Sequence, residues 1–273
     1  MTTRYLVLDI ETVPQADLVS RVRYAGEKLA PEEALKRYRA ELMAENGKDF
    51  APWTYHVPVA AVVGKVTADF RLEDLISLDE PEFRPHLIAD RFWKGMEGVY
   101  RDATLVTFNG RSFDLPVMEM AAFRYGIAAP GWFNSEGPSY KHPRNRYNAS
   151  AHLDLMDVVT NFSAVRGFAG GLSLLANLIG KPGKMDVQGS MVLDMHQAGK
   201  KQEISDYCRC DVLDTYFVFL RTLVMTGELS LEKEQERVAE TKKWLEARRE
   251  SCPAYALYLD RWGDWVDPRK GPA

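Results

Sequence analysis

The sequence predicts a mixed α/β fold, in which one β-sheet is covered by helices. Apolar strands are expected at 4–12 and 57–66, a short strand at 104–108 runs into a turn and a helix, and a strongly apolar helix spans 202–225. Strands interleaved with helices in this way are typical of a sheet that helices cover. At 273 residues and 46% hydrophobic content, the chain is long enough to bury such a core.

The other expected elements extend this sheet and its cover. In chain order they are a polar helical insertion near 15–50, a weaker strand at 70–78, helices at 85–100 and 113–125, a loop at 128–149, an extended piece at 152–155, a helix that ends at Gly180, and a charged helix followed by an irregular tail. No linker marks a second domain. We therefore expect one domain at 1–226, carrying that insertion, and a short helical C-terminal extension at 227–273.

Composition narrows the class of protein. The formal net charge is 35 − 39 = −4, which argues against binding nucleic acid by electrostatics alone, although an enzyme that places metal ions against phosphates stays open. Three cysteines without framework spacing indicate a reducing compartment. With no signal peptide and no apolar run of transmembrane length, a cytoplasmic protein without a membrane partner is the simplest expectation.

The first strand places two carboxylates on one face. Side chains alternate along a strand, so Tyr5, Val7, Asp9 and Glu11 point one way and the intervening residues the other. Burying two neighbouring anions is costly, and each raises the pKa of the other unless a cation neutralises them. On this stretch alone, the alternative is a strand whose polar end simply reaches water.

Two later stretches add carboxylates. Asp114 follows the strand at 104–108, at the strand end where open α/β sheets bind ligands, although an aspartate there could also be a helix N-cap. Asp211 lies on the apolar stripe of the long helix, one turn after Tyr207. A carboxylate on a buried stripe needs a partner, and a bound cation is at least as good an explanation as a salt bridge.

Four carboxylates, Asp9, Glu11, Asp114 and Asp211, thus predict an all-oxygen metal site. Such ligands suit hard octahedral ions, so the expected cofactors are two divalent cations, Mg²⁺ or Mn²⁺. Two such ions about 3.5–4 Å apart can activate water and stabilise the leaving oxygen in phosphodiester hydrolysis.

These stretches resemble a known family. Asp-Ile-Glu-Thr at 9–12, Asn109-x-x-x-Phe113-Asp114 and Tyr207-x-x-x-Asp211 look like the three motifs of the DEDD superfamily of 3′–5′ exonucleases. The tyrosine resembles the DEDDy branch, and the closest similarity is to stand-alone bacterial proteins related to the exonuclease domain of family-B DNA polymerases. The resemblance spans about residues 5–223.

The resemblance implies a ribonuclease-H-like fold and metal-dependent release of 5′-mononucleotides from the 3′ end of single-stranded nucleic acid. It assigns Asp9, Glu11 and Asp211 to one metal ion and Asp114 to the second, with Asp9 bridging both. Tyr207 would orient the attacking water. DNA is favoured over RNA by the family-B resemblance alone. An exoribonuclease and an inactive nucleic-acid-binding module of the same fold are the alternatives, and a replication or repair partner stays open.

Substrate contacts are expected at the motifs and in a basic, aromatic loop at 140–147. The candidates are Thr12, Asn109, Phe113, Lys141, Arg144 and Arg146, each with a plain structural alternative, which for Phe113 is core packing. Lys181 and Lys184 are weaker candidates of the same kind.

Four further aspartates need an interpretation. Asp154 most simply caps a helix and at most supports the site, and Asp214 is the fallback ligand if Asp211 is misassigned. Asp157 and Asp206 are expected to be solvated.

Overall fold

The computed structural model describes residues 2–183 and 191–270 and contains a five-stranded mixed sheet. Its strands are β1 (Thr3–Pro14), β2 (His56–Thr67), β3 (Leu72–Ser77), β4 (Thr104–Thr107) and β5 (His152–Asp154), in the spatial order β3-β2-β1-β4-β5. The first three are antiparallel neighbours, whereas β4 and β5 run parallel to β1. The expected α/β class with a ribonuclease-H-like sheet is therefore confirmed.

The central strand β1 has the alternation that the sequence predicts. Val7 and Val13 belong to the core on one side of the sheet, and Leu6, Leu8 and Ile10 belong to the core on the other. The pairing of β1 with β2 ends at Pro14, opposite His56, so the strand runs two residues beyond the expected end at 12. Proline is tolerated at such a strand end.

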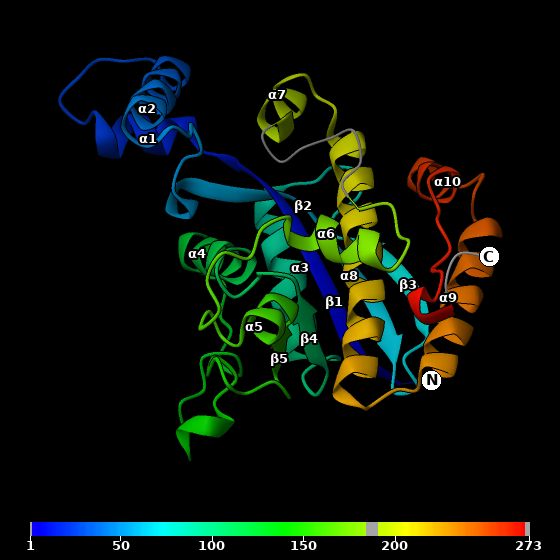
Figure 1. The fold of residues 1–273 in the computed structure, drawn as a ribbon. Coiled ribbons are helices and arrows are strands. Elements are labelled where there is room, and N and C mark those ends of the chain that lie inside the picture. Colours follow the sequence, from blue (N-terminus) through cyan, green and yellow to red (C-terminus); the bar gives the residue numbers. More distant parts are fainter. Residues whose placement is uncertain (1, 184–190, 271–273) are drawn as a thin grey trace.

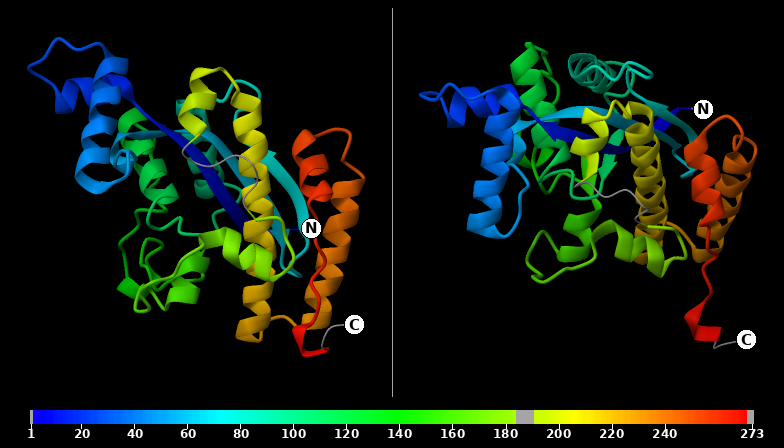
Figure 2. Two further views of the ribbon diagram at one scale, coloured as in Figure 1. Left: turned by 45° about the horizontal axis from the view of Figure 1, so that its top comes forward. Right: turned by 90° about the horizontal axis from the view of Figure 1, so that it is seen from above.

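Helices cover both faces of the sheet (Figures 1 and 2). On one face lie α3 (Pro85–Glu97) and α4 (Asp114–Tyr125). The other face is covered by α5 (Leu155–Thr160), α6 (Gly171–Leu178), α7 (Val192–Gln197) and the long α8 (Lys201–Thr226). In Figure 1, α8 lies in front of the sheet and runs alongside β1. This places the third carboxylate-bearing stretch over the first.

The polar insertion forms a helical pair at the carboxyl end of β1 (Figure 1). It consists of α1 (Ala16–Arg23) and α2 (Pro31–Asn46), and Pro31 stands at the first helical position as predicted. A small core of its own, including Val19, Leu35 and Tyr38, holds the pair together. The short helix η1 (Trp53–Tyr55) then leads into β2.

The C-terminal residues pack against α8. Helices α9 (Leu231–Glu246) and α10 (Pro253–Asp260) bury Leu245, Tyr255 and Tyr258 in the same core as α8, and η4 (Pro268–Lys270) follows. Lys181 holds this tail, since its ammonium donates to the Gly263 carbonyl (2.7 Å).

Lys181 is only 3% exposed, so the expectation that it contacts substrate is wrong, and Lys184 lies outside the described residues. Among the described helices, none combines the length and the apolarity needed to cross a membrane.

Candidate active site

Three of the predicted carboxylates come together where α8 crosses β1. Asp9 and Glu11 extend from the face of β1 that α8 covers, and Asp211 extends from α8. Each offers a carboxylate oxygen, and the three oxygens lie within 4.8 Å of one another. A polar end of the strand open to water, the alternative left by the sequence, does not describe them, because Glu11 is only 8% exposed and Asp9 is partly buried.

Asp114 joins this group from α4. Its side chain is 6% exposed, and the backbone amide of Ile10, between Asp9 and Glu11, hydrogen-bonds its carboxylate. The β1–β4 pairing ends at Val7, three residues before that amide. Asp114 is not the helix N-cap, since Phe113 occupies that position and α4 begins at Asp114. The structure therefore gathers all four carboxylates around the carboxyl half of β1, and we call them the acidic cluster.

The electrostatics of the acidic cluster favour a bound cation. Burial raises the pKa of Asp9 well above its ordinary range, and repulsion by Asp211, Asp114 and Glu11 adds to the shift. Burial also raises the pKa of Asp114 to about 7, with Asp154 and Asp211 contributing repulsion. Carboxylate oxygens that repel one another at this spacing are the donor set that Mg²⁺ or Mn²⁺ prefers. The residues present thus fit a divalent metal ion.

Tyr207 lies beside the acidic cluster, one helical turn before Asp211. It is 6% exposed and its side chain hydrogen-bonds Asp211. Burial, followed by the charges of Asp211, Glu11 and Asp9, raises the pKa of the Tyr207 hydroxyl above its ordinary value. Tyr207 therefore keeps its proton at neutral pH and can act as a hydrogen-bonding group.

Cys208 supports the acidic cluster from the same helix, a contact that the sequence analysis did not foresee. Its thiol lies 3.2 Å from the Asp9 carbonyl oxygen and 3.4 Å from Asp9 Oδ2, close enough to donate a weak hydrogen bond. Burial raises the pKa of this thiol well above its ordinary value, and the charge of Asp9 adds to the shift. The sequence signal for this contact is the place of Cys208 on the same apolar stripe of the helix as Asp211.

Asp154 holds the loop that leads to Asp114. It caps α5 through the Met156 amide (3.0 Å), as expected, and also accepts hydrogen bonds from the amides of Asn109 and Arg111, both at 2.8 Å. Asn109 itself adopts a left-handed conformation with φ of 63°. Asp154 is therefore a support for the turn between β4 and α4. No local pattern in the sequence links it to a loop more than 40 residues earlier.

Two aspartates that were expected to be solvated are not. Asp157 is 9% exposed and bonds Arg111 Nε (2.9 Å) and Arg146 (3.2 Å), so this expectation is wrong. Asp206 is partly buried and accepts a hydrogen bond from Gln202 (3.1 Å). Both carboxylates are therefore held by hydrogen bonds to neighbouring side chains.

The fallback ligand Asp214 points away from the acidic cluster. It is 1% exposed and accepts a hydrogen bond from the hydroxyl of Tyr258 on α10 (2.7 Å). Burial raises its pKa to about 7. Within the part of the chain that the structure describes, the group of acidic residues able to hold a metal ion contains Asp211 and not Asp214.

The Thr12 hydroxyl is engaged by His56. Thr12 Oγ1 lies 2.8 Å from His56 Nδ1, and His56 Nε2 lies 3.2 Å from the Ala51 carbonyl oxygen. A carbonyl can only accept, so Nε2 carries the proton of the neutral ring, Nδ1 accepts, and the Thr12 hydroxyl donates. Phe113 is partly buried against the core beneath α4, which agrees with the packing alternative, and its ring also contacts His56.

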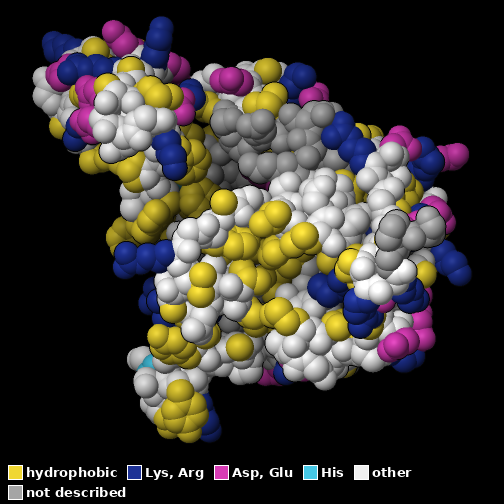
Figure 3. Space-filling model, in the orientation of Figure 1, with side chains coloured by type: hydrophobic (Ala, Val, Ile, Leu, Met, Phe, Trp, Pro, Cys, Tyr) yellow, Lys and Arg dark blue, Asp and Glu magenta, His cyan; other side chains and the backbone are white. Residues whose placement is uncertain are grey.

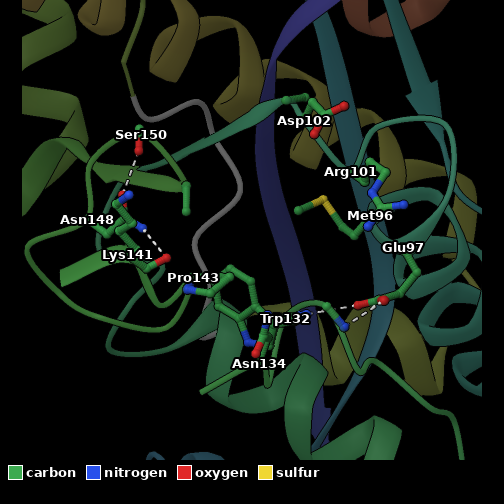
Figure 4. A pocket seen from close by; sticks show the side chains of 13 residues that line it. Met96, Glu97, Arg101, Asp102, Trp132, Asn134, Lys141, Pro143, Asn148 and Ser150 are labelled. Atoms are coloured by element: carbon green, nitrogen blue, oxygen red, sulfur yellow. Dashed lines mark hydrogen bonds between the residues drawn. The ribbon is translucent and has the colours of Figure 1, made fainter. Parts of the chain in front are cut away.

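The basic loop does not place Lys141 near the acidic cluster. Lys141, in the short helix η2 (Ser139–Lys141), lines a cavity of about 340 Å³ together with Ala103 and Ala151, which directly precede β4 and β5 (Figure 4). This cavity therefore lies at the amino ends of those strands, whereas Asp114 follows the carboxyl end of β4. Arg144 forms a double hydrogen bond with Glu119 (2.8 and 2.9 Å). The roles of these basic residues in substrate binding stay predictions.

Comparison with known proteins identifies the family. A family model described as a predicted 3′–5′ exonuclease related to the exonuclease domain of PolB matches residues 48–262, which is more than half of the chain. The chain belongs to this family. The matched range of this PolB-exonuclease-related chain contains Asp114, Tyr207 and Asp211, whereas Asp9 and Glu11 precede it. Exonuclease domains of this kind use divalent metals, with which the acidic cluster is compatible.

The chain is also distantly similar to a solved polymerase structure. The family B DNA polymerase from the hyperthermophilic archaeon Pyrobaculum calidifontis shares 16% identity with the chain, at a TM-score of 0.49. The match covers 82% of this chain and 25% of the polymerase, so the chain spans about a quarter of that protein. No curated protein matches the chain at a significant level.

Proposed function

We propose that the protein is a metal-dependent 3′–5′ exonuclease that hydrolyses the terminal phosphodiester bond of single-stranded nucleic acid, DNA in preference, and releases 5′-mononucleotides. The observation that carries this proposal is the convergence of Asp9, Glu11, Asp114 and Asp211 from three distant stretches, with Tyr207 beside them, in a chain of the PolB-exonuclease-related family.

In this proposal the acidic cluster holds two divalent cations, Mg²⁺ or Mn²⁺. Asp9, Glu11 and Asp211 would hold one ion, and Asp114 with Asp9 would hold the other. When bound, the ions supply an activated water and stabilise the leaving oxygen of the phosphodiester. They would also remove the repulsion that raises the pKa of the Asp9 carboxyl.

The surrounding residues position the reacting groups. Tyr207, which keeps its proton, would orient the attacking water through its hydroxyl rather than act as a base. The Cys208 thiol restrains Asp9, and Asp154 fixes the turn that carries Asn109 toward Asp114. The proposed contacts to the strand are Thr12, Asn109, Phe113, Lys141, Arg144 and Arg146.

The test is degradation of single-stranded oligonucleotides labelled at the 3′ or the 5′ end, as DNA and as RNA, with Mg²⁺, Mn²⁺ or EDTA. We expect a 5′-labelled substrate to shorten stepwise from its 3′ end, only with metal, and faster for DNA. Asp9→Ala should abolish cleavage. Asp206→Ala is the matched control. This carboxylate lies next to Tyr207 on the same helix, but it accepts a hydrogen bond from Gln202 and is not part of the acidic cluster.

Three outcomes would contradict the proposal. They are cleavage in EDTA by the purified protein, an Asp9→Ala variant as active as the parent, and internal cuts without 3′-terminal release. Binding of the oligonucleotide without any cleavage would favour a binding module of the same fold, and faster degradation of RNA would identify an exoribonuclease.

A further inference from the structure

Three aromatic rings meet at the carboxyl end of β1. Phe50 lies 4.8 Å from His56 and 5.8 Å from Phe113, and the last two rings are 5.9 Å apart, measured between ring centroids. The rings come from three separate segments, since Phe50 follows the α1–α2 insertion, His56 begins β2 and Phe113 precedes α4. Centroid separations of this size are typical of interacting aromatic pairs.

This aromatic cluster is linked to the residues next to Glu11 and Asp114 in the sequence. His56 accepts the hydroxyl proton of Thr12, the residue after Glu11, and Phe113 directly precedes Asp114. Consecutive Cα atoms are about 3.8 Å apart, so Phe113 is one residue from Asp114, and the residue that His56 bonds is one residue from Glu11. Phe50 therefore packs beside the two segments that carry Glu11 and Asp114.

Phe50 is the member that solvent reaches. It is 53% exposed, whereas His56 is 4% exposed and Phe113 is partly buried. Figure 3 shows apolar side chains gathered between the insertion and α4, the elements that precede Phe50 and follow Phe113. Burial lowers the pKa of His56 to about 4, so the aromatic cluster is uncharged at neutral pH. The aromatic cluster thus exposes the apolar ring of Phe50, which packs against His56 and Phe113.

The small exposed area of the Phe50 ring indicates what kind of ligand can bind it. A protein partner needs about 800 Å² of contact on each side, far more than one phenyl ring supplies. A nucleobase, in contrast, needs a single π-face, and stacking on exposed aromatic rings is how proteins hold single strands without sequence preference. A base inside a duplex has both faces covered by its stacked neighbours, so it cannot offer one to such a ring.

We propose that Phe50 stacks against a base at the 3′ end of the single strand and so contributes both affinity and the preference for unpaired ends. The proposal rests on the proposed function and extends it to the α1–α2 insertion, which none of the exonuclease motifs includes. Because every base has a π-face, this contact would serve all four nucleotides.

The test compares Phe50→Ala, Phe50→Trp and the control Phe123→Ala. Phe123 is 87% exposed on α4, more than two helical turns beyond Asp114, and contacts no other ring among the described residues. Base stacking is worth about 1–3 kcal/mol by alanine substitution, so Phe50→Ala should raise KM for single-stranded DNA roughly 5- to 150-fold. The value of kcat should change less, Phe50→Trp should restore KM, and Phe123→Ala should match the parent.

Two further measurements separate stacking from a structural effect. With abasic residues at the two 3′-terminal positions, the parent and Phe50→Ala should have the same KM, since no base is left to stack. In EDTA, binding of an oligonucleotide ending in 2-aminopurine should quench its fluorescence with the parent and much less with Phe50→Ala. Thermal melting checks that the variants are folded.

Equal KM values for the parent and Phe50→Ala on normal DNA, an equal loss on the abasic substrate, or equal 2-aminopurine quenching would overturn the proposal. The quenching measurement needs no catalysis. A parent without metal-dependent cleavage would therefore refute the proposed function, while the quenching comparison still decides the role of Phe50.

Discussion

The acidic cluster should make the metal-free protein less stable as the pH rises, and the share that Asp114 contributes can be worked out. Its pKa of about 7 compares with about 3.9 for an ordinary aspartate in the unfolded chain. Three pKa units correspond to roughly 4 kcal/mol at about 1.4 kcal/mol per unit. Below pH 4 the carboxyl is protonated in both states. Between pH 4 and 7 this carboxyl ionises only in the unfolded chain, so its contribution to stability falls over that range and then levels off above pH 7.

The assay is urea unfolding from pH 4 to 8 in EDTA and again with millimolar Mg²⁺. In EDTA, Asp114→Asn should lose the part of the slope between pH 4 and 7 that Asp114 contributes, and it should exceed the parent in stability by up to about 4 kcal/mol at pH 8. Mg²⁺ should stabilise the parent more than the variant, because a ligand stabilises only the state that binds it.

Asp214→Asn is the matched control for this effect. Burial raises the pKa of Asp214 to about 7 as well, so its replacement should remove a similar slope in EDTA, but Mg²⁺ should stabilise this variant as much as the parent. The reasoning is refuted if Asp114→Asn keeps the full pH slope of the parent, or if Mg²⁺ stabilises Asp114→Asn as strongly as the parent.

Three other predictions concern the residues around the acidic cluster. Tyr258→Phe removes the donor to the buried Asp214 and should lower the free energy of unfolding by about 1–3 kcal/mol with kcat unchanged, measured by urea unfolding and nuclease assay. Asp154→Asn keeps only one acceptor oxygen for three backbone amides. The free energy of unfolding should therefore fall by about 1–3 kcal/mol, and kcat/KM should fall as well. A variant with the kcat/KM of the parent would contradict the loop-positioning role. If Arg144 and Arg146 contact phosphates, each alanine variant should reduce the salt slope of DNA binding by about 1, and an unchanged slope would exclude that contact.

The elements that the sequence predicts best are those with regular periodicity. The period-two pattern of β1 puts Val7 on one face and Leu6 and Leu8 on the other, and the structure agrees. The strand extends two residues past its expected end at 12, because the missing amide of proline excludes one hydrogen bond but not a place at the end of a ladder. Periodicity reports which face is buried, and it says less about where pairing stops.

The acidic cluster was predictable because its members lie in recognisable motifs, but its supports were not. The bonds from Cys208 to Asp9 and from Asp154 to Asn109 join residues 199 and 45 positions apart. Asp157 looked solvated for the same reason, since its partner Arg111 is 46 residues away. Such contacts depend on how the strands and helices pack, which no local pattern encodes.

The supports of Asp9 and Asp114 share one chemical property, which explains why these two carboxylates favour a bound cation. Asp9 is restrained by a neutral thiol, and Asp114 by a backbone amide. Arg209, on the same helix as Asp211, turns the other way and pairs with Glu80 (2.6 Å). Neutral donors orient a carboxylate without cancelling its charge, whereas a guanidinium would neutralise it and occupy the space of an ion. Burial and then the repulsion between neighbouring carboxylates raise the pKa of Asp9 and of Asp114, and that same repulsion favours a divalent metal ion at the cluster.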